Sequence, residues 1–222
     1  MNKASVIIHI GLHKTGTRFF QRAVLRGLDP QKYAVNPEPL YSCLHDAARY
    51  PGDAARANAA RAAAGKTRAA IGGRTLVISD PALSGDMYSS HAGYRENLEL
   101  VAELFPEAHI IYFVRQHADW LQSAYRQSLK KGAGQSIERF LNFYDGQFYP
   151  RIGRLVLGAR NVEALTLSFV EIYRAYADKF GPERVYLFRQ EDLRRRSQEV
   201  YSRLIEVLGL TAMPSLPRRV SG

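Results

Sequence analysis

Four short apolar runs alternate with segments of helical spacing, and this alternation restricts the fold more than any other feature. The runs are SVIIHI (5–10), TLVISD (75–80), AHIIYFVR (108–115) and the first half of RVYLFRQEDL (184–193). Runs that are apolar at nearly every position suit strands buried on both faces of a parallel sheet. Strands that alternate with helices therefore predict an α/β fold with a doubly wound parallel sheet.

Helices that flank this sheet are predicted by the spacing of apolar residues between the runs. They fall at 17–28, 93–105, 118–132, 136–144, 167–181 and 199–210. Residues 33–42 (YAVNPEPLYS) hold two prolines and predict a loop or a short strand. Residues 45–70 are rich in Ala and Arg, which indicates an exposed helix or a flap. The length of 222 residues predicts a single domain, 1–222.

A glycine-rich turn, GLHKTGT (11–17), joins the first run directly to a helical segment. Free N–H groups and the dipole at a helix N-terminus attract anions, so this turn predicts a P-loop-like phosphate site. The turn departs from the Walker pattern Gly-x-x-x-x-Gly-Lys-Ser/Thr. Thr17 and Arg18 stand where Lys and Ser/Thr would be, and the lysine, Lys14, lies inside the loop.

A second anion position is predicted where the run 108–115 ends in Arg115. Ser123 follows eight residues later, about two turns into the next helix. An arginine at a strand end needs either solvent or an anion, so Arg115 and Ser123 suit a second phosphate away from the first. Both positions together would suit a nucleotide with phosphates at both ends.

The chain resembles the PAPS-dependent sulfotransferases, which use 3′-phosphoadenosine 5′-phosphosulfate as sulfuryl donor. The K-[ST]-G-T loop of that family is similar to Lys14-Thr15-Gly16-Thr17. Its arginine, followed by a serine eight positions later, is similar to Arg115 and Ser123. VYLFRQEDL and the helix after it are also similar to the late part of the family pattern. The resemblance covers most of the chain, and residues 45–70 are its weakest part.

The resemblance implies transfer of a sulfuryl group to an acceptor hydroxyl without a metal ion. In this transfer Lys14 neutralises the charge of the leaving phosphate. It implies that the donor is bound by His13, Lys14, Thr15, Gly16, Thr17, Arg18, Phe19, Arg115 and Ser123. Arg18 and SLKKG (128–132) resemble glycan-type members and favour a carbohydrate acceptor. LPRRVSG (216–222) resembles the basic loop that closes over the 3′-phosphate, or only its beginning.

Three residues are candidates for the general base that takes the proton of the acceptor hydroxyl. Asp80 ends the run 75–80, near the place where some family members carry His or Glu. Glu38, in NPEPL, resembles the Glu-Pro glutamate of glycosaminoglycan-type members, and His45 is the third candidate. Glu38 and Asp80 are supported about equally, so the sequence leaves the catalytic base open.

The charge balance leaves two other classes of protein to consider. With 31 Lys and Arg against 21 Asp and Glu, the net charge of +10 attracts anions such as nucleotides, nucleic acid and acidic glycans. A P-loop kinase or NTPase would share the fold, but the Walker order and a well-placed Asp for Mg²⁺ are missing. A nucleic-acid-binding module is disfavoured because the basic residues are scattered and no known binding signature is present.

The location expected from the sequence is the cytoplasm. The single cysteine, Cys43, fits a reducing compartment. No stretch approaches the ~20 apolar residues of a membrane span, and no cleavable signal peptide is evident.

Overall fold

The computed structural model describes residues 5–150 and 161–214. Its main sheet has five strands, all parallel, in the order β2-β3-β1-β4-β7. The strands are β1 (Val6–His9), β2 (Tyr33–Val35), β3 (Thr75–Ser79), β4 (His109–Val114) and β7 (Val185–Arg189). The predicted α/β fold with a parallel sheet is confirmed, and the segment left as loop or short strand supplies the edge strand β2.

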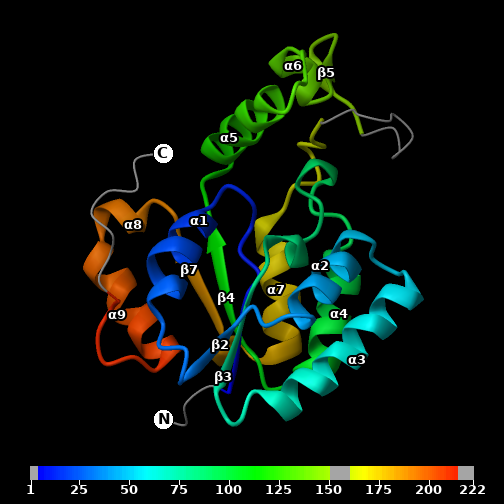
Figure 1. Ribbon diagram of the computed structural model, residues 1–222. Helices are drawn as coiled ribbons and strands as arrows, with labels where there is room; N and C mark the ends of the chain where they lie inside the picture. Colours follow the sequence, from blue (N-terminus) through cyan, green and yellow to red (C-terminus); the bar gives the residue numbers. More distant parts are fainter. Residues whose placement is uncertain (1–4, 151–160, 215–222) are drawn as a thin grey trace.

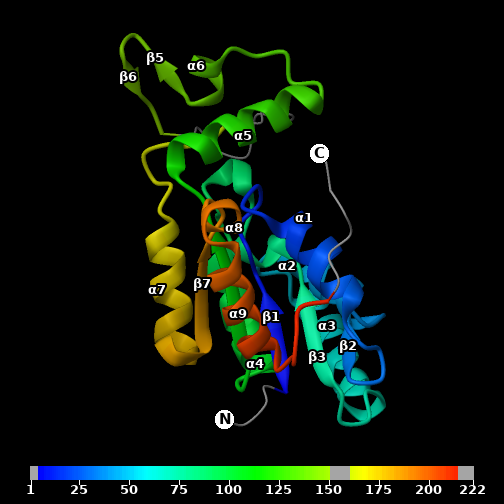
Figure 2. The same cartoon turned by 90° about the vertical axis from the view of Figure 1, so that its left-hand side faces the viewer.

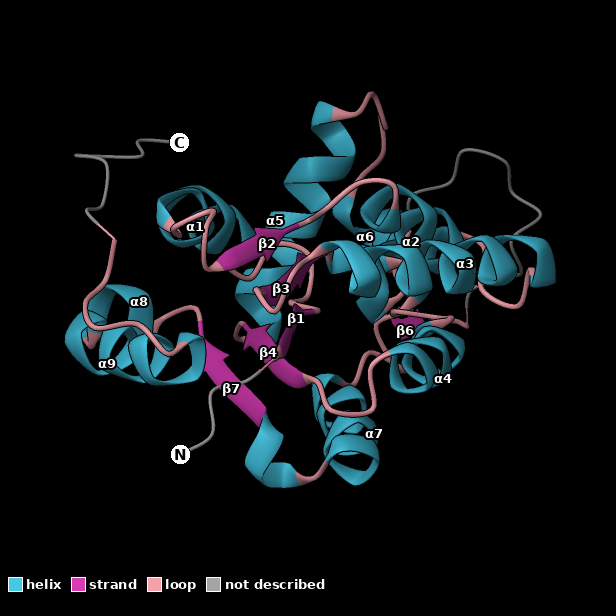
Figure 3. Ribbon diagram, turned by 60° about the horizontal axis from the view of Figure 1, so that its bottom comes forward, coloured by secondary structure: helices cyan, strands magenta, loops and turns pink. Residues whose placement is uncertain are grey.

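Helices cover both faces of the sheet, as Figures 1 and 3 show. On one face lie α2 (Leu40–Arg49), α3 (Ala54–Ala70), α4 (Tyr94–Leu104) and α7 (Phe169–Phe180). On the other lie α9 (Ser197–Leu208) and the helical segment made of α1 (Thr17–Phe19), η1 (Phe20–Val24) and η2 (Leu25–Gly27). Successive side chains of a strand point to opposite faces of the sheet, so Ile8 packs in the core on one face and Ile7 in the core on the other.

β1 lies in the middle of the sheet, with β3 on one side and β4 on the other. The chain leaves β1 toward β2 and β3 and then crosses back to β4, so the strand order reverses beside β1. Ligands of doubly wound sheets bind at such a reversal, outside the carboxyl ends of the strands. The loops that follow β1, β3 and β4 meet at this edge.

An arm extends beyond the carboxyl ends of the strands in Figures 1 and 2. It consists of α5 (His117–Lys130), α6 (Ile137–Phe140) and a hairpin of β5 (Phe143–Tyr144) and β6 (Gln147–Phe148). Trp120 and Ala124 are fully buried and anchor the first turns of α5 in the core. The sequence predicted a helix over 136–144, but the helix ends at Phe140 and the hairpin follows.

The Ala- and Arg-rich residues 45–70 form the end of α2 and the whole of α3. Ala60, Ala63, Ala64 and Thr67 recur at helical spacing and are buried, so their small side chains let α3 pack closely on its neighbours. Arg61 pairs with Glu103 of α4 at 2.6 Å. Within the described residues, no helix has the length and apolar character that crossing a membrane requires.

Candidate active site

The turn after β1 forms a tight loop whose backbone is bent at two positions. Lys14 has φ 67° and Gly16 has φ 111°, both in the left-handed region that side chains disfavour. Thr15 Oγ1 donates to the carbonyl oxygen of Leu12 at 2.5 Å, and Trp120 Nε1 donates to the carbonyl oxygen of His13 at 2.7 Å. These bonds hold the loop from inside and from α5, so Lys14 stays fixed in a costly conformation.

Positive charges converge on Lys14. Its Nζ donates to Gln127 Oε1 of α5 at 3.4 Å. Burial lowers the pKa of Lys14, and the charges of Arg18, Lys130 and Arg115 lower it further. Because like charges placed together repel, this arrangement favours a bound anion that would offset them.

A cavity of about 420 Å³ opens beside the loop. Its lining includes three cations and no carboxylate. The lining residues are His13, Lys14, Thr17, Arg18, Gln21, Pro81, Met87, Tyr88, Gln127 and Lys131. The cavity thus suits a ligand with negative charge.

Arg115 directly follows β4, and its side chain is half-buried. Its Nε is buried and has no hydrogen-bond partner within the described part of the chain. A buried guanidinium N–H without a partner is costly, and an anionic ligand would satisfy it. Ser123 lies half-buried two turns along the next helix, α5, as predicted from the spacing.

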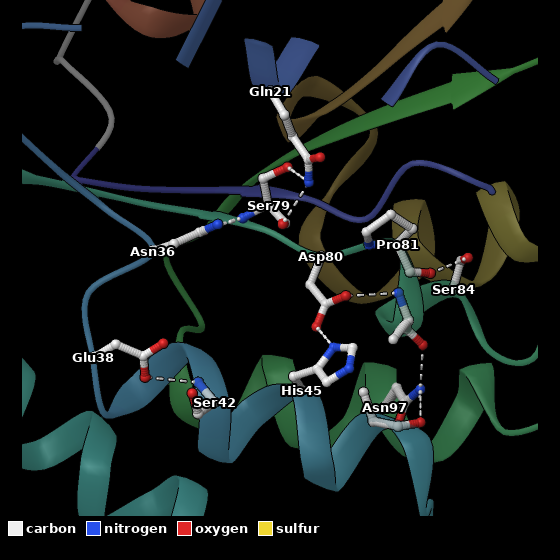
Figure 4. Close-up of polar contacts among 12 residues, drawn as sticks. Gln21, Asn36, Glu38, Ser42, His45, Ser79, Asp80, Pro81, Ser84 and Asn97 are labelled. Carbon is white, nitrogen blue, oxygen red and sulfur yellow. Dashed lines mark hydrogen bonds and ion pairs between the residues drawn. The ribbon is translucent and has the colours of Figure 1, made fainter. Parts of the chain in front are cut away.

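Two of the three candidate bases lie in direct contact, which Figure 4 shows. His45 Nδ1 lies 2.8 Å from Asp80 Oδ2, and Asp80 Oδ1 accepts the N–H of Ala82 at 2.9 Å. Asp80 is only 2% exposed, at the end of β3. The hydrogen bond to Asp80 raises the pKa of His45. Asp80 therefore holds His45 in one orientation and stabilises its protonated form.

Glu38, the other candidate base, lies apart from this pair. It is exposed and accepts the N–H of Ser42 at 3.2 Å at the beginning of α2. Figure 4 shows Glu38 turned toward Ser42 and His45 turned toward Asp80. None of the three candidate bases is among the residues that line the cavity, although Pro81, next to Asp80, is.

His13 connects the loop to the Asp80–His45 pair. It lines the cavity, and the charges of Asp80 and His45 both act on it. Burial nevertheless lowers the pKa of His13, so its imidazole is neutral at neutral pH.

Phe19 lies on the other side of the loop, toward α9. Its ring stacks on that of Tyr201 with centroids 6.0 Å apart. The short helix α8 (Asp192–Arg195), which follows β7, also approaches the loop, because a Cβ at Gly16 would lie 3.1 Å from Leu193 Cδ1. The predicted C-terminal segment 216–222 lies outside the described residues.

Three site residues were missed by the sequence analysis: Trp120, Gln127 and Gln21. The spacing contains a signal for Gln21, which follows Thr17 by one helical turn and therefore faces the same side. Trp120 and Gln127 reach the loop from more than a hundred residues away in sequence, and no local pattern indicates such contacts. The described residues contain no group of three or more His, Cys, Asp or Glu side chains that could hold a metal ion.

The fold and the loop define an α/β protein with an anion site at the carboxyl edge of a parallel sheet. Residues 7–214 match the family model described as "Sulfotransferase family", and the chain belongs to that family. The resemblance noted in the sequence is thereby confirmed, and the protein is an enzyme that transfers a sulfuryl group. No curated protein matches the sequence at a significant level.

Similar solved structures support the same fold. A sulfotransferase from Alicyclobacillus acidocaldarius matches with a TM-score of 0.63 at 18% identity, over 99% of this chain and 88% of that chain. The sulfotransferase domain of the Synechococcus PCC 7002 olefin synthase matches with a TM-score of 0.55 at 16% identity, over 99% of this chain and 81% of the other. The sulfotransferase domain from the curacin biosynthetic pathway matches with a TM-score of 0.50 at 16% identity, over 100% of this chain and 81% of that chain.

Proposed function

We propose that the enzyme transfers the sulfuryl group of 3′-phosphoadenosine 5′-phosphosulfate to an acceptor hydroxyl by in-line displacement. The observation that carries this proposal is the buried, unpartnered Nε of Arg115 among the described residues. Arg115 follows β4, whereas Lys14 lies in the loop after the neighbouring strand β1. Two cationic positions at adjacent strand ends suit a nucleotide that carries phosphate at both its 3′ and 5′ positions.

The residues of the loop would hold the 5′-phosphosulfate. In this proposal the backbone N–H groups and the cationic or polar side chains of the loop bind it. Lys14 contacts the oxygen between phosphorus and sulfur and neutralises charge as the sulfur–oxygen bond breaks. Arg115 and Ser123 bind the 3′-phosphate, and Phe19 packs against the adenine. The contributors proposed for the donor are His13, Lys14, Thr15, Gly16, Thr17, Arg18, Phe19, Arg115 and Ser123.

The proton of the acceptor hydroxyl needs a base on the face of the sulfur opposite the leaving phosphate. The contact between Asp80 and His45 favours this pair over Glu38. Both oxygens of Asp80 are already hydrogen-bonded, so Asp80 acts through His45, whose neutral imidazole accepts the proton. Glu38 remains the alternative base that the sequence suggested.

The acceptor that we propose is a hydroxyl of a carbohydrate. The cationic lining of the cavity supports a ligand with acidic or strongly polar groups. Two similar structures come from an olefin synthase and from the curacin biosynthetic pathway, so the fold alone does not select a sugar.

Transfer from radiolabelled 3′-phosphoadenosine 5′-phosphosulfate tests the proposal. The acceptors would be oligosaccharides, phenols and lipid-linked sugars, separated after the reaction. Label on an oligosaccharide is the expected result. Label on phenols alone would contradict the carbohydrate acceptor, and an enzyme that does not bind the donor would contradict the whole proposal.

A further inference from the structure

The sheet order divides the site into two halves around the loop. Arg115 and Ser123 belong to the half that follows β4, whereas Ser79, Asp80 and Pro81 belong to the half that follows β3. If the nucleotide of the proposed donor extends from the loop toward Arg115, the acceptor must approach from the β3 half. The inference below rests on this part of the proposed function.

Gln21 reaches across from the helical segment after the loop to the end of β3. Its Nε2 donates to the carbonyl oxygen of Ser79 at 3.1 Å and to Ser79 Oγ, also at 3.1 Å. A carboxamide nitrogen has two hydrogens, so both are used. Figure 4 shows the other end of this carboxamide, Oε1, pointing away from Ser79. Gln21 lines the cavity.

A buried network fixes Ser79 and therefore Gln21. The N–H of Ser79 donates to Asn36 Oδ1 at 2.7 Å, and Ser79 Oγ lies 2.8 Å from His9 Nδ1. His9 and Ser79 are fully buried, and burial lowers the pKa of His9 to about 3, so the network carries no charge at neutral pH. If the carboxamide rotated by half a turn, Gln21 Oε1 would face the carbonyl oxygen of Ser79, and two acceptors would repel.

Gln21, a residue of the cavity lining, therefore holds in place a polar atom, Oε1, that can only accept a hydrogen bond. The ionised oxygens of phosphate and sulfate are also acceptors only, so Gln21 Oε1 cannot bind them. Lys14 and Arg18 in the same lining are donors, and Gln127 Oε1 already accepts from Lys14. Among the groups of a sulfate acceptor, a neutral O–H is a partner that Gln21 Oε1 can use.

Apolar side chains line the same cavity as Gln21. Pro81, Met87 and the ring of Tyr88 line it, and Tyr88 packs edge-on against Phe140 at 6.5 Å between centroids. A sugar ring has C–H faces that suit such a wall and hydroxyls around its edge. We propose that Gln21 Oε1 accepts a hydrogen bond from a second hydroxyl of the acceptor, next to the one sulfated, so that the enzyme selects polyols over monohydric alcohols and phenols.

Gln21→Met tests this inference, because methionine keeps the length of the side chain and removes the acceptor oxygen. The probes are methyl glucoside and methyl galactoside as polyols, and cyclohexylmethanol and phenol as monohydric acceptors, each with radiolabelled donor. In the native enzyme we expect label on a glycoside in preference to both monohydric compounds. Loss of one neutral hydrogen bond should lower kcat/KM for that glycoside roughly tenfold and leave any residual rate on monohydric compounds unchanged.

Gln127→Met is the matched control. Gln127 lines the same cavity, but its Oε1 is engaged by Lys14, so this change should alter turnover without changing the ratio of glycoside to monohydric rates. Ser79→Ala should shift that ratio in the same direction as Gln21→Met, because it releases the carboxamide.

Two results would overturn the inference. One is an equal loss on both classes of acceptor in Gln21→Met, and the other is no label on either glycoside. Binding of adenosine 3′,5′-bisphosphate, measured in parallel by calorimetry, separates these results from failure of the proposed function. If it binds normally to the native enzyme and to Gln21→Met, the proposed donor site stands, and an equal loss on both classes of acceptor then rejects the role of Gln21 alone.

Discussion

His45 Nδ1 lies 2.8 Å from Asp80 Oδ2, although the two residues are 35 positions apart in sequence. The hydrogen bond joins the middle of α2 to the carboxyl end of β3, beside the loop that carries Lys14. It raises the pKa of His45 above its usual value of 6.5.

The pH dependence of kcat/KM should therefore show a rising limb with its midpoint above pH 6.5, because the imidazole of His45 accepts a proton only in its neutral form. Asp80→Asn removes the largest cause of the raised pKa and should move the midpoint to lower pH. The pH–rate profiles of both proteins provide the measurement. An unchanged midpoint would mean that another group titrates.

The His45–Asp80 pair should also make the stability of the fold depend on pH. A raised pKa in the folded state means that the pair stabilises the fold fully below pH 6.5, and that this contribution is lost as pH rises through the raised pKa. Urea unfolding of native protein and Asp80→Asn at pH 5.5 and pH 9 should show a larger difference at the lower pH. A larger difference at pH 9 would contradict the direction of the shift.

Glu38→Gln should retain turnover within a few fold, because Glu38 is exposed and has no contact with the Asp80–His45 pair. His45→Ala should lose about 10²–10⁴ in kcat, as general bases typically do. Donor binding should stay normal in both variants, which serves as the control for folding. The opposite order of losses would make Glu38 the base.

Lys14→Ala should reduce kcat by about 10²–10³ and affect donor affinity much less, because its charge acts mainly as the leaving phosphate gains charge. Single-turnover kinetics and a separate measurement of donor binding distinguish the two effects. A variant with near-native kcat and weak donor binding would show that Lys14 only anchors the donor.

Gly11→Ala should destabilise the fold by roughly 1–3 kcal/mol, because a Cβ at Gly11 would lie 2.2 Å from Nε2 of the buried His9. Gly134→Ala is the matched control, since nothing lies within 4 Å of its added Cβ. Urea unfolding gives both values. Equal stabilities of the two variants would mean that the loop can move away from His9.

The core of the fold follows from sequence because each of the strands β1, β3, β4 and β7 contains at least three consecutive apolar residues. Ile7 and Ile8 of β1 are fully buried, as expected for a strand in the middle of a parallel sheet. The packing of α3 was not predicted, because its buried face consists of alanines that look no more apolar than the exposed ones. The two-residue strands β5 and β6 are too short to leave a periodic pattern.

The anion loop could be predicted because Lys14, Gly16 and Thr17 are neighbours in sequence. The pairing of His45 with Asp80 and that of Gln21 with Ser79 depend on how α2 and η1 pack on β3. Such contacts join residues from separate elements, so their geometry appears only in the folded chain.

In the proposed function, the site binds a nucleotide with phosphates at both ends. Thermal unfolding with adenosine 3′,5′-bisphosphate, AMP and ATP with Mg²⁺ tests it most directly. A ligand at a hundredfold excess over its Kd stabilises the fold by about 2.7 kcal/mol. We predict a clear rise in Tm with adenosine 3′,5′-bisphosphate and a much smaller rise with AMP, with the difference lost in Arg115→Ala. Equal shifts from the two nucleotides, or a larger shift from ATP with Mg²⁺, would contradict this mode of binding.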